Sequence, residues 1–379
     1  MSKGIMHIEF YKHALTDQDR KNVDNVLRSL FLTTGSVTAT FEDKFAEWTG
    51  VPYVVGLTSC TAALHLSLLA LGIGPGDEVI TTPMTFIATA TAIIHAGATP
   101  VFVDVEEESG LLDVDRVEGA ITERTKAIIP VHLYGTMVDM RLLRKVADRN
   151  QLFIIEDCAH CIEGERDGIR PGDLGDTACY SFYATKNLTC GEGGAVATKR
   201  PEIAKKIKIL RLHGMSKDAA SRYQGAYKHW EMTHLGWKYN MSDIQAALLV
   251  DQLDRLSEMQ RKRKRIFRLY SDIFQNLPGI MLPAIYGEGA HHLYTIWIKD
   301  KERDMVLEKL GNAGIGVAVN YRAIHTLSYF RETFSMIPSD YSIANQIGNQ
   351  TLSLPLYPVL SDQDIRYVTD TVSTVLTTI

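Results

Sequence analysis

The chain has 379 residues, of which 45% are hydrophobic and 22% are charged, and its formal net charge is −5. This composition predicts a globular protein large enough for two domains. The mild charge argues against nucleic-acid binding, and we interpret the one dense basic run, QRKRKR at 260–265, as the solvated face of a helix. No apolar run approaches the roughly 20 residues of a membrane span, and MSKGIMHIEF at 1–10 lacks the apolar segment of a secretory signal. We therefore expect no membrane contact and a cytoplasmic location.

Short β-rich runs alternate with helix-like stretches through the first part of the chain. The alternation predicts an α/β fold in which helices flank a mostly parallel central sheet. The runs expected to form strands are YVVGL (53–57), EVITT (78–82), VFVDV (101–105), KAIIPV (126–131) and LFIIED (152–157).

After about residue 242 the pattern changes to one long helical stretch and then to mixed short elements. We expect a smaller C-terminal α+β domain there. No Pro-rich or Gly-rich linker marks the boundary, so we place it within the long helix. The predicted domains are residues 1–250, a large cofactor-binding domain, and residues 251–379.

Polar residues close several of the predicted strands. Ligands of open α/β sheets bind beyond the carboxyl ends of the strands, so these residues are the candidates for a site. They are Thr58-Ser59-Cys60-Thr61, residues 82–86, residues 132–135, Asp157 with His160, and Lys186.

Asp157 and Lys186 together suggest a cofactor. Asp157 closes a buried run, where a carboxylate needs a cation or strong donors. Pyridoxal 5'-phosphate (PLP) uses both residue types, because a lysine amine forms a Schiff base with it and a carboxylate keeps its ring nitrogen protonated. A lysine in that role must lose its proton, so we expect burial and nearby positive charge to lower the pKa of Lys186. The hydroxyl and N–H groups at 58–61 offer a phosphate seat, although the same residues are ordinary helix N-caps.

The spacing of Cys158 and Cys161 raises a different possibility. C-x-x-C occurs in redox and zinc sites, and His160 offers a further ligand, but no fourth ligand is evident and Cys179 and Cys190 are too far apart to form a second pair. We interpret the cysteines as half-buried thiols of a reducing compartment and expect no metal. A zinc or thiol redox protein remains the alternative.

The segment SFYATKNLTCGEGG at 181–194 resembles the S-F-x-x-x-K-x-x-x-x-G-E-G-G signature of the DegT/DnrJ-type nucleotide-sugar aminotransferases, which are PLP enzymes of fold type I. Further segments resemble the family in the family's order, from about residue 8 to the C-terminus. Within the family, the resemblance is nearest to the enzymes that form UDP-4-amino-4-deoxy-L-arabinose, through KYN (238–240), HGMSKDA (213–219) and YRAIHTLSYFRETF (321–334). The other matching segments are GPGDEVITTPMTFIATATAI, RTKAIIPVHLYG, IIEDCAH, LGWKYNMSDIQAAL and SLPLYP.

The resemblance implies an aminotransferase that moves the amino group of L-glutamate onto a UDP-4-keto sugar and works as a homodimer with shared active sites. A 3-keto sugar, or a GDP- or dTDP-linked 4-keto sugar, is the alternative substrate. Some relatives are dehydratases with histidine in place of the lysine, and Lys186 argues against that class. A non-enzymatic PLP-binding regulatory protein on the same fold is the alternative of another kind.

The resemblance also implies roles for residues that would bind the cofactor. Lys186 would hold PLP covalently and shuttle protons, and Asp157 would pair with the ring nitrogen. Phe86 would stack on the ring, and His160 would lie near its O3' or phosphate side. The phosphate would be held by Thr61, by Ser181 and by the backbone of Cys60.

For the remaining candidates the resemblance implies contacts with substrate or with a second subunit. Asn240 would reach the phosphate from the neighbouring subunit, unless it serves only the N-terminus of the following helix. Residues expected to line the sugar pocket are Thr34, Tyr134 and His325, and Lys238 or Arg322 would bind the glutamate carboxylate or the nucleotide diphosphate.

Overall fold

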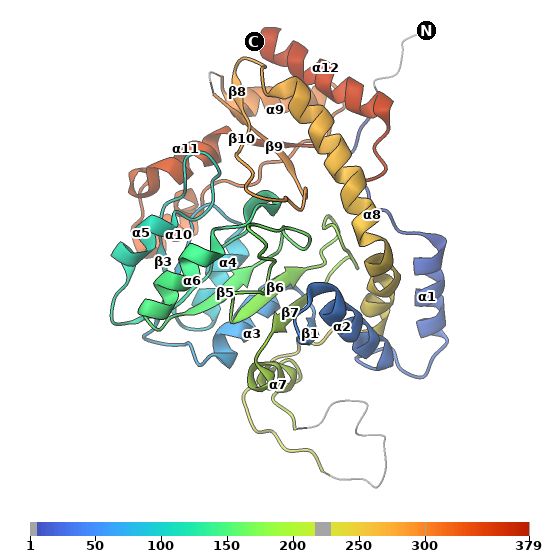
Figure 1. Ribbon diagram of the computed structural model, residues 1–379, viewed down its shortest axis with the longest axis vertical. Helices are drawn as coiled ribbons and strands as arrows, with labels where there is room; N and C mark the ends of the chain where they lie inside the picture. Colours follow the sequence, from blue (N-terminus) through green and yellow to red (C-terminus); the bar gives the residue numbers. More distant parts are fainter. Residues whose placement is uncertain (1–5, 217–228, 300, 379) are drawn as a thin grey trace.

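A seven-stranded sheet forms the centre of the computed structural model, which describes residues 6–216, 229–299 and 301–378. The end of the HGMSKDA segment, 217–219, lies outside the described residues. The strand order is β1-β7-β6-β5-β4-β2-β3. Neighbours from β3 through β6 pair in parallel, whereas β7 runs antiparallel to both β6 and β1, which confirms the mostly parallel sheet (Figure 1). The strands are β1 (Tyr53–Leu57), β2 (Glu78–Thr81), β3 (Thr99–Phe102), β4 (Thr125–Ile128), β5 (Phe153–Asp157), β6 (Thr177–Ser181) and β7 (Gly194–Thr198).

Two strands differ from the apolar runs that predicted them by more than one residue at an end. The run at 126–131 yields a strand that stops at Ile128, and Pro130 shortly after it has no backbone N–H to give to a ladder. The run at 101–105 is shifted, because β3 begins at Thr99, whose N–H bonds to Asp77 O, and ends at Phe102.

Helices cover both faces of the sheet. One apolar cluster joins α3 (Cys60–Ala70), α4 (Ile87–His95) and α7 (Pro201–Leu210) to one face. Two further clusters join α2 (Ser36–Thr49), α6 (Met140–Arg149) and the start of α8 (Asp243–Phe274) to the other. Strands β2, β6 and β7 are buried along their whole length, as expected of strands covered on both sides.

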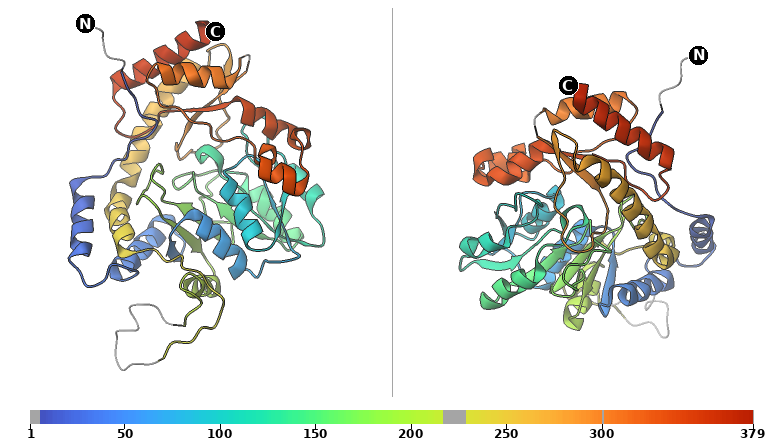
Figure 2. Two further views of the ribbon diagram at one scale, coloured as in Figure 1. Left: turned by 180° about the vertical axis from the view of Figure 1, so that it is seen from behind. Right: turned by 45° about the horizontal axis from the view of Figure 1, so that its top comes forward.

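Helix α8 connects the large sheet to a smaller one (Figures 1 and 2). It begins with a capping box between Ser242 and Gln245, packs against α1 (Asp17–Leu27) and α2, and reaches α12 (Asp362–Thr378) near its other end. The smaller sheet is antiparallel, in the order β10-β9-β8, and it agrees with the expected C-terminal α+β part. Its strands are β8 (Ile280–Met281), β9 (Tyr294–Ile298) and β10 (Thr351–Leu354).

The predicted boundary between residues 250 and 251 falls inside α8 and remains a prediction. The N-terminal segment also contacts the C-terminal part, since the Ile8 N–H bonds to Gly314 O at 2.8 Å and Ile8 packs in the apolar cluster of the smaller sheet. No helix among the described residues is long and apolar enough to cross a membrane.

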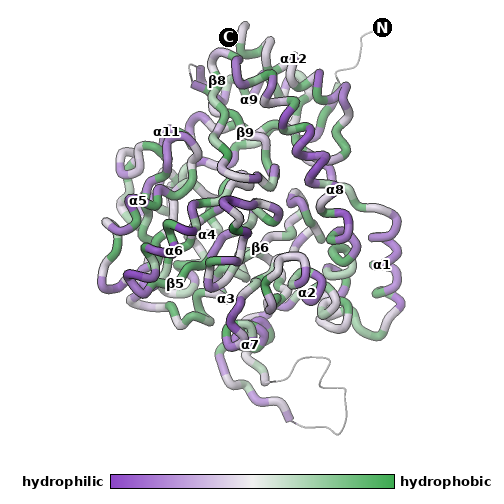
Figure 3. Tube along the Cα trace, viewed as in Figure 1, coloured by the Kyte–Doolittle hydropathy of each residue, from purple (hydrophilic) through white to green (hydrophobic). Residues whose placement is uncertain are grey.

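The remaining helices lie around these two sheets, and the outer helix α1 is largely hydrophilic along its trace (Figure 3). The α-helices are α5 (Val114–Val117), α9 (Arg303–Asn312), α10 (Ser328–Phe334) and α11 (Ser342–Gln350), and the 3-10 helices are η1 (Glu118–Ala120), η2 (Leu133–Gly135), η4 (Ile324–Thr326) and η5 (Pro338–Tyr341).

Candidate active site

A cavity of about 550 Å³ lies beyond the carboxyl ends of β5 and β6. Most of its wall comes from the large-sheet region, and Asn320 and Tyr321 close it from the C-terminal part of the chain. The strand-end rule therefore located the cavity correctly. Predicted site residues in its wall are Cys60, Thr61, Phe86, Asp157, His160, Ser181 and Lys186.

Lys186 is half-buried in the loop between β6 and β7 and faces this cavity. Burial lowers its pKa from 10.5 to about 8, while Cys60 and Asp157 act in the opposite direction. The shift has the predicted sign, but burial produces it and no positive charge is needed. At pH 7 about a tenth of these amines would be unprotonated, which is the form that attacks a carbonyl.

Asp157 ends β5 with its side chain buried at the cavity wall. Oδ2 accepts a hydrogen bond from Thr89 Oγ1 at 2.8 Å, and Oδ1 accepts one from the Ala159 N–H at 3.1 Å. Burial raises the pKa of Asp157 despite these donors and the nearby Lys186. The carboxylate is thus incompletely stabilised by the protein alone, and a cation in the cavity would lower the pKa again.

The N-terminus of α3 supplies backbone donors to the cavity. Ser59 caps the helix by accepting from the Ala62 N–H at 3.1 Å, whereas the N–H groups of Cys60 and Thr61 have no acceptor among the described residues. Such a helix end favours an anion. Close packing fixes its place, because a Cβ on Gly194 would lie 2.3 Å from the carbonyl carbon of Ser59. Gly194, the last glycine of the signature, therefore lets β7 approach the start of α3.

Aromatic rings and one histidine form another part of the wall. Phe86, directly before α4, is 52% exposed, which is unusual for this side chain unless a ligand covers it. The Tyr321 ring lies 5.6 Å from the Phe86 ring between centroids. His160 Nδ1 accepts from the Tyr134 N–H at 3.3 Å, so its proton is on Nε2, which lies 2.8 Å from Tyr321 Oη. Burial lowers the pKa of His160 well below its usual range and keeps the ring neutral.

Asn240 and Thr34 lie together outside the cavity wall formed by the described residues. Asn240 Nδ2 donates to Thr34 Oγ1 at 2.7 Å, and Thr34 Oγ1 donates to Met241 O at 2.6 Å. The Asn240 Oδ1 atom is buried and has no hydrogen-bond partner among the described residues. Their predicted contacts with phosphate and sugar remain predictions.

The other four substrate candidates also lie outside this wall, as the described residues form it. Tyr134 lines a separate cavity of about 250 Å³, and its hydroxyl is 3.2 Å from Thr351 Oγ1. His325 is buried, with Nε2 at 3.3 Å from Pro338 O. Lys238 and Arg322 are exposed on the surface.

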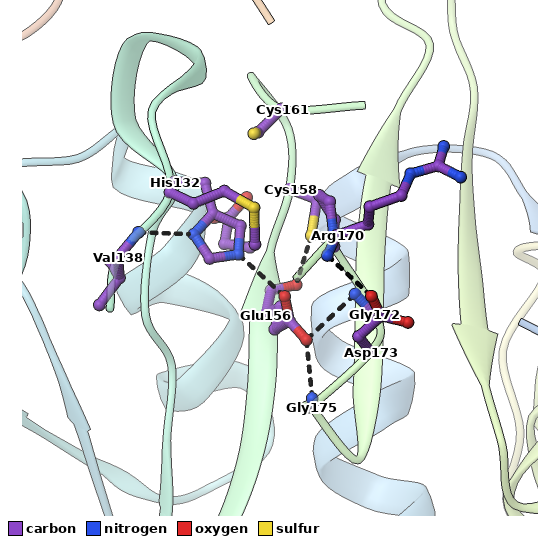
Figure 4. A network of polar contacts seen from close by, with 12 residues as sticks. His132, Val138, Glu156, Cys158, Cys161, Arg170, Gly172, Asp173 and Gly175 are labelled. Carbon is purple, nitrogen blue, oxygen red and sulfur yellow. Dashed lines mark hydrogen bonds and ion pairs between the residues drawn. The ribbon is translucent and has the colours of Figure 1, made fainter. Parts of the chain in front are cut away.

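The cysteines of the C-x-x-C motif are free and fully buried rather than half-buried. Burial raises the pKa of both thiols, so they stay protonated and lack the thiolate that binds metal or attacks disulfides. Cys158 lies with His132 and Glu156 in a cluster of potential ligand atoms. Figure 4 shows that hydrogen bonds occupy this cluster, since Glu156 contacts His132 and the N–H groups of Gly172 and Gly175. The arrangement suits a structural network better than a metal or redox site.

Among the wall residues that were not predicted, Thr89 and Tyr321 contact predicted ones. Thr89 donates to Asp157 from the first turn of α4, and its place three residues after Phe86 was the available signal. Tyr321 meets His160 across 161 residues of sequence, and no local pattern announces that contact.

The wall fits PLP in chemical type. It combines an amine of lowered pKa, a buried carboxylate that a cation would stabilise, free N–H donors at a helix end and an exposed aromatic face. These are the groups needed for the aldehyde, the ring nitrogen, the phosphate and the ring of this cofactor.

Comparison with known proteins agrees with this fit. Residues 13–373 match the model of the DegT/DnrJ/EryC1/StrS aminotransferase family. The spore coat polysaccharide biosynthesis protein SpsC of Bacillus subtilis is 42% identical over 364 residues, which cover 94% of this chain and 93% of SpsC. The putative sugar aminotransferase Spr1654 from Streptococcus pneumoniae, solved in its PMP form, superposes with a TM-score of 0.93 at 33% identity, covering 98% of this chain and 100% of that one.

A structure of DesI determined in the presence of its TDP-sugar product superposes with a TM-score of 0.87 at 30% identity, covering 98% of this chain and 93% of that one. The fold is that of the PLP-dependent transferases of type I, and the cofactor is PLP. The chain belongs to the DegT/DnrJ/EryC1/StrS aminotransferase family and is a PLP-dependent nucleotide-sugar aminotransferase.

Proposed function

We propose that the enzyme transfers the amino group of L-glutamate to C4 of a UDP-4-keto sugar, with Lys186 as the catalytic residue. The observation that carries the proposal is the convergence of Lys186, Asp157 and the α3 N-terminus on one cavity. The choice of a UDP sugar and of its 4-position rests on the resemblance of residues 238–240 and 321–334 to the enzymes that form UDP-4-amino-4-deoxy-L-arabinose. A 3-keto sugar or a GDP- or dTDP-linked 4-keto sugar is the second candidate, favoured by the TDP sugar of DesI.

When bound, PLP supplies an electron sink that lets the α-proton of an amino acid leave. Lys186, with a pKa near 8, takes this proton from the α-carbon of glutamate and later delivers a proton to C4 of the sugar. Asp157 holds a proton on the ring nitrogen through its carboxylate, and Thr89 orients that carboxylate. Phe86 covers the ring, and the backbone of Cys60 with Thr61 and Ser181 holds the phosphate.

The first experiment is an absorbance spectrum of the PLP-loaded protein before and after L-glutamate is added. We expect the visible band of the bound cofactor to bleach with wild type, and Lys186→Ala to show neither the band nor its bleaching. L-aspartate and L-alanine at the same concentration test the choice of donor. A band that glutamate leaves unchanged would refute glutamate as the donor.

The sugar is tested next with the glutamate-treated enzyme. A panel of UDP-, GDP- and dTDP-linked 4-keto and 3-keto sugars should restore the cofactor band at different rates. We expect the UDP-4-keto sugar to give the largest rate constant. If the cofactor band returns faster with another sugar of the panel, the UDP-4-keto assignment is wrong and that sugar is the better candidate.

We also propose a homodimer in which Asn240 of one subunit completes the site of the other. The buried, unpartnered Oδ1 of Asn240 supports this, since such an atom needs a donor. Mixing unfolded Lys186→Ala and Asn240→Ala chains and refolding them together should restore about a quarter of wild-type activity, because half of the dimers would then carry one intact site. No recovery would show that each site is built from one chain.

The five free, buried cysteines suit the reducing cytoplasm, which we propose as the location.

A further inference from the structure

A buried polar network lies behind Lys186, and Asn187 is its centre. Asn187 Nδ2 donates to Glu163 Oε2 at 2.9 Å and to Ala290 O at 3.0 Å. Because the amide nitrogen is used in both bonds, Oδ1 is the acceptor end, and it lies 3.2 Å from His292 Nδ1. The side chain next to Lys186 in sequence is thus held at both ends of its amide.

Glu163 is fixed in turn by α8. Its second oxygen, Oε1, receives the guanidinium of Arg263, and the two side chains are only 1% and 2% exposed. Burial raises the pKa of Glu163, whereas Arg263 and Asn187 favour its ionised form. Each carboxylate oxygen therefore has one fixed donor, Arg263 on one and Asn187 on the other.

The orientation of Asn187 selects one tautomer of His292. Since Asn187 Oδ1 only accepts, Nδ1 of His292 must carry the proton. The ring of His292 then lies 4.7 Å from the ring of His160, which bonds Tyr321 in the cavity wall. One path of contacts thus runs from Arg263 on α8 through Glu163, Asn187 and His292 to His160 in the cavity wall.

Stability alone is a weak reason for such a network. An ion pair with both partners buried loses about as much in desolvation as it gains in attraction, and apolar side chains of similar size often stabilise as well. The loop that carries Lys186 has no regular secondary structure, and its backbone is tied by the Lys186 N–H to Tyr183 O at 2.9 Å. A side-chain anchor beside Lys186 limits where its amine can lie.

We propose that Glu163, held by Arg263, is a positioning residue that orients Asn187 and through it places Lys186 and His292 for proton transfer. The inference rests on the proposed role of Lys186. Glu163 lies outside the cavity wall that the described residues form, and it acts through Asn187.

The test uses Glu163→Gln in the PLP-loaded enzyme, because glutamine keeps the shape but cannot accept from both Arg263 and Asn187 through two oxygens. The pH midpoint of the cofactor absorbance, measured without substrate, reports the charge state at Lys186. The titratable groups that face Lys186 are Asp157, Cys60, His160 and His292. With Arg263 no longer neutralised, we expect the midpoint to fall by about half a pH unit.

The glutamate half-reaction should slow by about tenfold in Glu163→Gln, with the half-saturating glutamate concentration changed less than about twofold. Asn187→Ala, which keeps the buried ion pair, should slow it by a similar factor. The double variant should be no slower than the slower single one, because both changes break one path. Glu288→Gln is the matched control, since it removes a second ion pair of α8, with Lys264, that does not touch Asn187. It should change neither the midpoint nor the rate.

A lower thermal midpoint in Glu163→Gln with an unchanged absorbance titration and half-reaction would overturn the proposal and leave a structural role. Multiplicative losses in the double variant would show that Glu163 and Asn187 act separately, which also overturns it. If Glu163→Gln does not fold, Asn187→Ala decides alone, because an unchanged rate there removes the link to Lys186. Failure of the proposed function is distinguished by Lys186→Ala, which would then keep the cofactor band.

Discussion

Two consecutive carboxylates at the end of β5, Glu156 and Asp157, are both buried, yet their surroundings differ in kind. Neighbouring residues of a strand point to opposite faces of the sheet. Glu156 is saturated by protein donors, namely His132 Nε2 at 2.9 Å and the N–H groups of Gly172 and Gly175 at 3.1 and 2.7 Å (Figure 4). Asp157 lies against an open cavity with a pKa raised by burial.

The difference shows that adjacent residues of one strand can have different roles, one structural and one a candidate for catalysis. Glu156 ties the 170–175 loop and the segment after β4 to the end of β5, so it supports the site without entering it. Asp157 lacks a full complement of donors, and that deficit is what a cationic cofactor nitrogen would satisfy. A buried acid with all partners present is a structural residue, and one that faces a cavity short of partners is a candidate for function.

The largest effect should come from neutralising the open carboxylate. Asp157→Asn should lower the rate constant of the glutamate half-reaction by about a thousandfold, because a neutral amide cannot hold the proton on the ring nitrogen. Glu156→Gln should lower it by no more than about threefold. Single-turnover absorbance measurements provide both values. Equal losses in the two variants would remove the distinction between the two acids.

For the free energy of unfolding we expect the opposite order, with the larger loss in Glu156→Gln. Glu156→Gln should lower the free energy of unfolding by about 3 kcal/mol, because the amide NH2 would face donors that now meet a carboxylate. Asp157→Asn should lower it by less than about 1 kcal/mol in the cofactor-free protein, since burial already disfavours its charge. Urea unfolding followed by fluorescence measures the difference. A larger loss in Asp157→Asn would contradict it.

The pH dependence of stability tests a second ionisable group of the cavity, Lys186. In the cofactor-free protein the pKa of Lys186 is lowered from 10.5 to about 8, so between these values the unfolded chain binds more protons. Stability should therefore rise with pH across this window, by about 2 kcal/mol once partial exposure is allowed for. Below pH 8 the full penalty of the buried charge is present. Lys186→Met should be more stable than wild type at pH 8 and lack this rise, whereas Lys126→Met, on the surface, should keep it.

The smallest effect concerns the hydrogen bond that orients Asp157. Thr89→Val removes the Oγ1 donor at 2.8 Å and should weaken cofactor binding by about fivefold. Thr81→Val is the matched control, because it removes a buried threonine hydrogen bond of 2.9 Å to Ile129 O, away from the cavity. Equilibrium titration with PLP measures both constants. Equal weakening would mean that general loosening of the sheet, not Asp157, sets the affinity.

The sequence pointed to the cavity because its strongest signals are local. Strand ends follow from apolar runs, and the rule that ligands bind at carboxyl ends singled out Thr61, Asp157 and Lys186, which line one cavity. The antiparallel direction of β7 was not predictable, since GAVAT reads the same as a parallel buried strand.

Long-range contacts were the part that the sequence concealed. Tyr321 enters the wall from the C-terminal part, and its position depends on how the two sheets pack. The C-x-x-C spacing suggested a metal or redox site for a related reason. Spacing alone does not reveal that burial keeps both thiols protonated. Equally, Glu156 and Asp157 look alike in the run IIED, and only the packing of the 170–175 loop separates them.

The close approach of β7 to α3 has a consequence for protein engineering. A side chain at Gly194 would collide with the Ser59 and Cys60 backbone, 2.3 to 2.6 Å from a Cβ, so no rotamer relieves the clash. A substitution library that varies the cavity to accept new sugars should leave position 194 untouched. Diversity is better placed at Tyr321, whose side chain borders the cavity and can change size without moving the backbone at the start of α3.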